Sequence, residues 1–395
     1  MVSERGLGRL SPDARHILTV QALRAFAYGL GSVLIGVTLA DLGLSGTQVG
    51  LVLGALLAGM ALVSLALART GAHHGRRRWY IGLIVTMGLA GTVYALTDSV
   101  WLLVLAGLTG TISTDVVESG PFTSLEQAML PEVAGAGDPT RLFGTYNTVA
   151  TLAGSLGALA AGGPPLLDIA SQRWLLAYSV AALAALVAAY GLSPAVERAL
   201  TPAPAPPLHR SRGIVVRLSG LFALDSFGGG FVTQSFIAYV FVRKYDASLE
   251  TLSWTFFAVG ILQAISFQAA VRIAGRIGLL RTMVFTHLPT NVLLAAIAFA
   301  PDLGTAIALL LARSLLSQMD VPTRQAYVVR VVDQSEWTAA AAYTNTARYV
   351  TRPVAPPLAG VALQIALGAP FVIAGALKSV YDVGLYVLFR NVRPP

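Results

Sequence analysis

Ionisable side chains that interrupt strongly apolar segments are the residues of this chain whose types could do chemistry. Arg24 lies in the first such segment with Tyr28 one helical turn later, and Asp225 lies at nearly the equivalent depth of a later segment, with Gln234 further along. A charge in a membrane-spanning helix is costly and usually faces a bundle interior or an aqueous cavity, where it marks a functional site. Arg24 and Asp225 are therefore expected to approach each other, either in a transport site or as a static ion pair.

A second group of candidate residues is Thr111, Asp115 and Glu118, which are spaced i, i+4 and i+7 and would share one face of a helix. Two carboxylates one turn apart repel each other when both are ionised, so one of them is expected to hold a transferable proton. The alternative is that both lie near the cytoplasmic end of the helix and pair with loop arginines such as Arg76.

Arginines form a third group. Arg313 lies in one apolar segment, and Asn345, Arg348 and Arg352 follow in the next at i, i+3 and i+7. Guanidinium groups bind carboxylates and phosphates in a bidentate manner, so three of them on adjacent helices could hold an anionic group. The other interpretation, of equal weight, is that they neutralise the carboxylates at positions 115, 118 and 225.

The composition indicates a membrane environment. Of 395 residues, 55% are hydrophobic and 12% are charged, whereas soluble domains carry about 25% charged residues. The chain has no cysteine, its five histidines have no metal-ligand spacing, and it has no glycine-rich ATP-binding loop. It also lacks a His/carboxylate or Ser/Lys constellation at a spacing that suits catalysis. We therefore expect no metal, no cofactor and no enzymatic activity.

The distribution of the charges predicts the orientation in the membrane. A net charge of +8 could suggest nucleic acid, but the basic residues concentrate in alternate loops, as the positive-inside rule requires. We therefore expect a multi-pass protein of the cell (inner) membrane with both termini in the cytoplasm, in contact with the lipid bilayer and not with nucleic acid. The basic loop residues are Arg76, Arg77 and Arg78, then Arg210, Arg212 and Arg217, and then Arg272, Arg276 and Arg281.

Twelve apolar segments of spanning length predict an all-α polytopic membrane protein. They are arranged as two pseudo-symmetric six-helix bundles, residues 1–192 and 217–395, joined by a cytoplasmic linker, residues 193–216, that is polar and rich in proline. The predicted spans are residues 15–40, 48–69, 79–97, 100–119, 141–162, 174–192, 217–242, 252–271, 282–300, 304–320, 338–360 and 370–389.

Prolines and short polar stretches mark the ends of several segments. The stretches from Pro121 to Pro139 and from Pro322 to Glu336 are expected to cover the cytoplasmic face and to join helices. Pro353 and the prolines that follow it predict a bend or break in the eleventh segment. In the last segment, Lys378 and Asp382 are spaced i, i+4 and are expected to form a structural ion pair.

The two halves also match each other at an offset of about 200 residues, which indicates a duplication. The matches occur in the same order in both halves. They are Tyr28-Gly29-Leu30-Gly31 with Phe227-Gly228-Gly229-Gly230, Arg69, Gly75 and Arg78 with Arg272, Gly278 and Arg281, Pro121 with Pro322, and Asn147-Thr148 with Asn345-Thr346. The glycines of the first pair of matches, Gly29, Gly31 and Gly228–Gly230, are expected to allow close packing of helices.

With this parallel repeat, the chain resembles the major facilitator superfamily, and the resemblance covers nearly all of it. The most family-like element is the basic loop after the second helix, where Gly75, Arg76 and Arg77 match the family pattern and Ala72 replaces its aspartate. The resemblance implies a cytoplasmic gate loop here, repeated at Gly278 and Arg281, and the missing aspartate puts the family's cytoplasmic latch in doubt. It also implies a monomer whose first, fourth, seventh and tenth helices line a central cavity.

These observations predict a secondary active transporter that moves a small organic molecule by alternating access, coupled to protons and directed outward. Alternatives are an organic-anion or phosphorylated-metabolite carrier and, from another class, a non-transporting receptor or assembly factor with the same fold. The expected proton-coupling residues are Asp115, Glu118 and Asp225, and the expected substrate-binding residues are Arg24, Tyr28, Gln234, Arg313, Asn345, Arg348 and Arg352.

Overall fold

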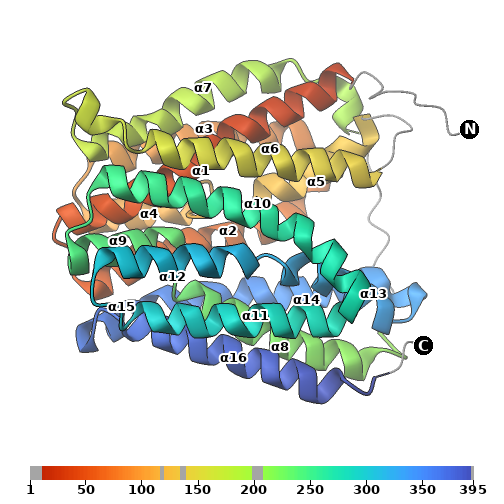
Figure 1. Cartoon of the computed structure of the whole chain (residues 1–395). Coiled ribbons are helices and arrows are strands. Elements are labelled where there is room, and N and C mark those ends of the chain that lie inside the picture. The colour runs from red at the N-terminus through yellow and green to blue at the C-terminus, as the bar shows by residue number, and fades with distance from the viewer. Residues whose placement is uncertain (1–10, 116–119, 134–138, 198–207, 393–395) are drawn as a thin grey trace, which may run out of the picture.

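A computed structural model describes residues 11–115, 120–133, 139–197 and 208–392, which fold into helices without a β-strand (Figure 1). The α-helices are α1 (Pro12–Asp41), α2 (Gly46–His74), α3 (Arg76–Leu96), α4 (Val100–Leu108), α5 (Pro121–Val133), α6 (Pro139–Ala160), α7 (Ala177–Tyr190), α8 (Arg212–Gly230), α9 (Gln234–Tyr245), α10 (Leu249–Ile277), α11 (Leu279–Ile297), α12 (Leu303–Leu316), α13 (Asp320–Val331), α14 (Trp337–Thr351), α15 (Ala355–Ile365) and α16 (Ala369–Phe389). Short 3-10 helices are η1 (Pro164–Leu166), η2 (Ser171–Leu176), η3 (Pro194–Glu197), η4 (Gln334–Glu336) and η5 (Arg352–Val354).

Long apolar helices with exposed apolar faces identify a membrane protein. Seven helical segments within the described ranges are long and apolar enough to span a bilayer: Pro12–Asp41, Gly46–Thr70, Arg76–Leu96, Ser171–Tyr190, Arg212–Tyr245, Leu249–Ile277 and Ala369–Phe389. Large side chains such as Leu89, Val187 and Phe299 are more than half exposed on the surface of the bundle. Such a surface is costly in water and is the surface that lipid chains cover.

The fourth and tenth predicted spans are interrupted, which corrects their sequence-based boundaries. The helix expected over residues 100–119 ends at Leu108, and the chain turns at Gly110, whose φ is +66°. A Cβ there would overlap the backbone of Gly59 on α2, so only glycine allows this approach. The helix then resumes as α5 at Pro121. The span expected over residues 304–320 is divided in the same way into α12 and α13.

The helices α5 and α13 contradict the prediction that these stretches are joining segments on the cytoplasmic face. Each lies inside its half of the bundle and buries one face, which includes Phe122 and Glu126 on α5 and Thr323 and Arg324 on α13. Pro121 is the first residue of α5, a position where its missing N–H leaves no hydrogen bond unmade. From the sequence, Pro121 is expected to start a loop, whereas in the structure it begins a buried helix.

The expected break in the eleventh segment is confirmed, because η5 separates α14 from α15 at Pro353. The seventh segment is interrupted as well, between α8 and α9. There the Thr233 hydroxyl accepts a hydrogen bond from the Phe236 N–H and caps α9. Non-helical backbone at membrane depth is stable only where protein or an aqueous cavity surrounds it, so these interruptions locate the interior of the bundle.

The helices form an amino half, α1–α7, and a carboxyl half, α8–α16, which contact each other through α1 with α9, α2 with α15 and α6 with α10 (Figure 1). Within the amino half, the glycines expected to allow close packing do so: a Cβ on Gly29 would overlap the Gly154 carbonyl on α6, and one on Gly31 would overlap the Tyr178 ring on α7. Within the carboxyl half, a Cβ on Gly230 would overlap the Arg352 carbonyl. The exact domain boundaries at residues 192 and 217 stay a prediction.

The two halves meet tightly at the end of the bundle opposite the termini. Gly46, Gly50 and Gly54 follow one face of α2, and a side chain on any of them would collide with α15 or the preceding turn, at Gly360, Pro356 and Pro357. Hydrogen bonds reinforce this end: the Ser235 hydroxyl donates to the Ser32 carbonyl over 2.9 Å, the Tyr239 hydroxyl to the Leu44 carbonyl over 3.0 Å, and the Gln364 amide to the Thr47 hydroxyl over 2.6 Å.

At the end that carries the termini, residues of α6 and α14 are exposed. Ser155 on α6 packs against Gly260 on α10, whereas Gly144 and Asn147, on the same face of α6 but nearer the termini, are exposed. Thr346 on α14 is exposed as well. The helices α5 and α13 lie at this end and have at most a few contacts with the opposite half among the described residues, so the structure is closed at one end and open toward the termini.

The chain between the two halves is anchored at each side by a carboxylate. Glu197 accepts hydrogen bonds from the N–H groups of Arg76 and Arg77, at the expected gate loop, where Gly75 has a φ of +82°. Glu336 accepts the N–H groups of residues 209, 210 and 211, and these bonds lower the pKa of its carboxyl to about 2. Glu197 thus supplies a carboxylate to the basic loop in which Ala72, outside the described side chains, replaces the family aspartate.

We predict that Gly50→Leu prevents closure of the end opposite the termini, because the new side chain occupies the space of the Pro356 carbonyl. The chain has no cysteine, so a Thr47→Cys, Gln364→Cys pair reports on closure through cross-linking by a short bifunctional thiol reagent. Cross-linking should fall severalfold in the Gly50→Leu background. It should persist with Gly275→Leu, where a Cβ meets nothing within 4 Å. Equal cross-linking in both backgrounds would contradict the proposed contact.

Candidate functional site

A buried ion pair forms the centre of the amino half. The Arg24 guanidinium on α1 donates to Glu126 on α5 over 2.7 Å, and both side chains are at most 5% exposed. The hydroxyls of Tyr146 on α6 and Tyr80 on α3 donate to the same carboxylate over 2.5 and 2.8 Å. The Arg24 guanidinium also lies 5.1 Å from the centre of the Phe122 ring. These partners satisfy most hydrogen-bonding groups of the pair in a region that excludes water, although Nε of Arg24 is buried without an acceptor.

This arrangement contradicts the expected approach of Arg24 to Asp225. Sequence reasoning missed Glu126, because it placed this residue in a surface segment after Pro121. A signal was present: Phe122, Glu126 and Met129 recur at helical spacing and are buried together. Tyr28, expected to bind substrate with Arg24, instead donates its hydroxyl to the Thr111 carbonyl over 2.9 Å, in the interruption after α4.

A larger network occupies the carboxyl half. Asp225 on α8 accepts from Lys378 on α16 over 2.5 Å and from Arg324 on α13 over 3.4 Å. Arg324 also bridges to Asp320 over 2.9 Å and lies 5.5 Å from the centre of the Phe222 ring. All of these side chains are buried. Asp225 is therefore a member of the network, held by two cations that are both distant in sequence.

A second buried group, centred on a histidine, lies within electrostatic range of this network. Nδ1 of His287 on α11 lies 3.0 Å from both carboxylate oxygens of Asp382 on α16, and Asn291 donates to the same carboxylate over 2.7 Å. Lys378 and Asp382 were expected to pair with each other. They have different partners, because Lys378 reaches Asp225 and Asp382 reaches His287.

The two halves bury an equivalent ion pair with opposite signs. In the amino half, the first helix supplies Arg24 and the segment after the interruption in the fourth span supplies Glu126. In the carboxyl half, the equivalent helix supplies Asp225 and the segment after the interruption in the tenth span supplies Arg324. An aromatic ring, Phe122 or Phe222, covers the arginine in each case. The duplication is thus visible in the geometry, although the charges themselves have exchanged sides.

Between the halves, Asp115 pairs with Arg352, which agrees for this one arginine with the second of the two interpretations given above. The pair connects the interruption after α4 with η5, so each partner lies on non-helical backbone or at a helix break. The helical face expected to hold Thr111 and Asp115 is absent, because α4 has already ended at Leu108. Glu118 lies outside the described residues.

Two arginines expected to bind an anionic group have no carboxylate partner within the described ranges. Arg313 on α12 and Arg348 on α14 are partly buried, and the Nε atom of each is buried without a hydrogen-bond acceptor. Both lie within electrostatic range of Asp225. Asn345, one turn before Arg348, is exposed. Gln234 begins α9 and lines a small space at the contact of α6, α9 and α10, apart from Arg24.

A bundle of spanning helices with interrupted segments, buried ion pairs and two halves related by duplication defines a membrane transporter fold. The sequence model of the Major Facilitator Superfamily matches residues 17–317, and the chain belongs to this family. It is therefore a membrane protein of a transporter family, for which the expected substrates are small molecules rather than nucleic acid.

Individual relatives support the same assignment. An uncharacterized membrane protein, YJR124C of Saccharomyces cerevisiae (strain ATCC 204508 / S288c), is 24% identical over 425 residues, which cover 97% of this chain and 95% of that protein. The crystal structure of the nucleoside transporter NupG is similar with a TM-score of 0.78 at 11% identity, over 96% of this chain and 99% of that chain. The crystal structure of a D-xylose-proton symporter is similar with a TM-score of 0.72 at 15% identity, over 96% and 98%. At these identities the two structures establish the fold.

We predict that Arg24→Leu destabilises the protein by about 3–5 kcal/mol, because it leaves the Glu126 carboxylate buried without its cation. The double variant Arg24→Leu, Glu126→Leu should recover most of this loss, since it removes both charges. Denaturant unfolding in detergent measures the three free energies of the cycle. Arg210→Ala, which breaks an ion pair whose arginine is 84% exposed, is the control and should cost less than about 1 kcal/mol. A double variant as unstable as the single one would contradict the assigned pairing.

Proposed function

We propose that this protein is a secondary active carrier for a small organic anion. It would work by alternating access, with the amino half (residues 1–192) and the carboxyl half (residues 217–395) moving against each other around the interrupted helices. The linker, residues 193–216, would permit this motion because each of its sides is tied to its own half. The open end and the closed end described above correspond to one of the two states that such a cycle requires.

The observation that carries the anion assignment is the pair of arginines without carboxylates. The carboxylates of Glu126, Asp115, Asp225 and Asp320 each have a cation, whereas Arg313 and Arg348 have none in the described part of the chain. A guanidinium kept inside a membrane protein without a counter-charge is costly. A bound carboxylate or phosphate would supply the missing charge and occupy the fork of donors in a bidentate manner.

The pairing of these four carboxylates with cations disfavours a carrier for lipophilic cations, because such a substrate needs a carboxylate that is free to bind it. A non-transporting receptor for an anion would need the same arginines, so a transport measurement distinguishes it from a carrier. Arg352 and Asn345 lie one turn after and one turn before Arg348 on the same stretch of chain. They would complete the anion site once substrate competes with Asp115 for Arg352.

We propose a proton as the coupling ion. Asp225 and Asp320 pair with two permanent cations, Arg324 and Lys378, and Asp382 lies within electrostatic range of Asp225. Asp382 faces His287, a side chain of a type that can take up and release a proton. Arg348 lies close enough to Asp225 for the two charges to interact. When an anion binds Arg348, the network would lose part of its positive charge, and proton uptake at His287 would compensate.

We propose a membrane orientation with both termini in the cytoplasm. The helices α3 and α8 begin, and α10 ends, at the end of the bundle that carries the termini (Figure 1). These positions bring Arg76–Arg78, Arg212 and Arg276 to one side, as the positive-inside rule requires. The open end of the bundle is then the cytoplasmic end, and a cell (inner) membrane location follows from the same distribution.

A ligand screen tests the anion assignment. We predict that anionic compounds raise the melting temperature of the purified protein, whereas matched neutral and cationic compounds do not. A ligand at about 100 times its Kd should stabilise the folded state by about 2.7 kcal/mol. Arg348→Gln and Arg313→Gln should each weaken the binding of the anion at least tenfold, since a hydrogen bond to a charged group is lost. Arg276→Gln, which removes an exposed arginine near the end of α10, is the control.

Uptake into proteoliposomes and into everted vesicles then distinguishes the outcomes. Accumulation of the anion supports a carrier, and the vesicle orientation in which it occurs separates export from import. Binding without accumulation under any ion gradient would favour a receptor. Stabilisation by lipophilic cations, unchanged in both arginine variants, would overturn the anion assignment.

The proton assignment has its own test. We predict that His287→Gln abolishes accumulation driven by a pH gradient but preserves substrate exchange between equal concentrations, because exchange needs no net proton movement. Asp382→Asn should behave in the same way. His209→Gln is the control, since only the backbone N–H of His209 takes part in the bond to Glu336. Gradient-driven accumulation that survives in both variants would assign proton coupling to another group or another ion to the cycle.

A further inference from the structure

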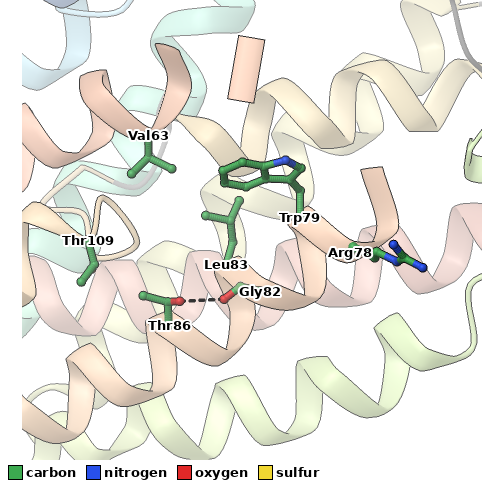
Figure 2. A pocket seen from close by; sticks show the side chains of 7 residues that line it. All are labelled: Val63, Arg78, Trp79, Gly82, Leu83, Thr86 and Thr109. Carbon is green, nitrogen blue, oxygen red and sulfur yellow. Dashed lines mark hydrogen bonds between the residues drawn. The ribbon is translucent and has the colours of Figure 1, made fainter. Parts of the chain in front are cut away.

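A groove on the outside of the amino half has no role in the proposed transport cycle. It lies between α2, α3 and the end of α4 and has a volume of about 440 Å³. Figure 2 shows its lining, in which Arg78 lies at one end and Val63, Thr86 and Thr109 lie toward the other, with Trp79 and Leu83 between them. The volume is in the range of sites that hold a small organic ligand.

The groove opens onto the surface that faces lipid. The same three helices carry exposed apolar residues: Leu62 and Leu65 on α2, Leu89 on α3 and Leu105 on α4 are between 48% and 63% exposed. An apolar surface of this kind on a membrane protein is covered by acyl chains. The groove is therefore accessible from the bilayer, and Arg313 and Arg348 are not among the residues that line it.

The polar groups of the groove concentrate at its cytoplasmic end. Three consecutive arginines begin α3, and two of them have partners: Arg76 pairs with Glu132 over 2.7 Å, and Arg77 donates to the Tyr190 carbonyl over 2.7 Å. Arg78 is exposed and has no ion pair in the described ranges. The indole N–H of Trp79 is buried without an acceptor. Of these groups, Arg78 is the exposed cation without an ion pair at the level where headgroups lie.

At the other end of the groove, the threonine hydroxyls already donate hydrogen bonds within the protein. The Thr86 hydroxyl donates to the Gly82 carbonyl over 2.7 Å, and the Thr109 hydroxyl to the Ala106 carbonyl over 2.6 Å. A Cβ on Gly82 would meet nothing within 4 Å, so the floor of the groove is open down to the helix backbone. From Arg78 to Thr86 the helix rises about 12 Å, which is less than half of a hydrocarbon core of about 30 Å. The groove therefore stays within one leaflet.

We propose that this groove binds one phospholipid with an anionic headgroup from the cytoplasmic leaflet. The headgroup phosphate takes Arg78, and an acyl chain runs past Val63 and Leu83 over Gly82. The chemistry that selects the ligand is a phosphate joined to a long apolar chain, which matches one polar end and one apolar end separated by the length of half a membrane. This inference rests on the proposed orientation of the membrane, but not on the identity of the transported substrate.

Two substitutions separate the contribution of the headgroup from that of the chain. Arg78→Ala removes the cation, and its matched control is Arg281→Ala, at the equivalent position of α11 and outside the groove. Gly82→Leu fills the floor, and its control is Gly220→Leu on α8, where a Cβ also meets nothing within 4 Å. Both glycines are exposed on helices, so leucine at either position is compatible with folding.

The experiment is native mass spectrometry of the full chain, titrated with phosphatidylglycerol or phosphatidylcholine of the same chain length. We expect one phosphatidylglycerol to bind more tightly than phosphatidylcholine. Arg78→Ala should lower the binding constant for phosphatidylglycerol about fivefold and abolish the preference, while Arg281→Ala leaves both unchanged. Gly82→Leu should reduce the binding of both lipids, and Gly220→Leu should not.

Three results would overturn the proposal. The first is an equal loss in Arg78→Ala and Arg281→Ala, which would indicate a diffuse response to surface charge. The second is unchanged binding in Gly82→Leu, which would place the acyl chain elsewhere. The third is displacement of the lipid by inorganic phosphate alone, which would indicate a phosphate-ion site rather than a lipid site.

Discussion

Charge inside a hydrocarbon layer requires a counter-charge within contact distance, and this constraint orders the whole bundle. The Arg24–Glu126 pair joins α1 to α5, and the Asp225 network joins α8, α13 and α16. Each of these contacts crosses between helices that are far apart in sequence. The helices cannot shift much against one another within a half without separating charges, so each half behaves as a stiff unit. The contacts between the halves are mostly of another kind, formed by glycines and prolines that can part without exposing charge.

The sequence predicted the class of fold and the existence of a duplication, but not the positions of the interruptions. Spanning helices are visible in hydrophobicity because twenty apolar residues have few other uses. The break after Leu108 depends on the close approach of Gly110 to Gly59, a tertiary contact that leaves no local signal. Placing residues 121–133 outside the membrane followed from Pro121 and two glutamates. Because Glu126 has Arg24, Tyr80 and Tyr146 as partners, it can lie in the interior.

Prediction of the candidate site from sequence was limited in the same way, because tertiary contacts leave little local signal. Sequence reasoning found many of the ionisable residues of the interior, since any charge in an apolar segment is conspicuous. It could not find their partners, because pairing depends on which helices are neighbours: Arg24 was matched with Asp225 and Lys378 with Asp382. It overlooked Arg324 and His287, the first because it follows Pro322 and the second because a single histidine in an apolar segment gives little signal. Only the pairing shows that Arg313 and Arg348 have no carboxylate partner in the described part of the chain, and the proposed substrate chemistry follows from this property.

The opposite signs of the two buried pairs also constrain the history of the chain. A duplicated ancestor would have carried the same residue at both equivalent positions of the first and seventh helices, and the same residue at both positions after the breaks. Today the arginine is on the first helix of one half and after the break in the other. A single substitution could not have produced this exchange, because each intermediate would have held two like charges or one unmatched charge in contact. The lineage must have passed through a neutral pair or a borrowed counter-ion, and the neighbouring Lys378 shows that one copy did recruit an additional cation.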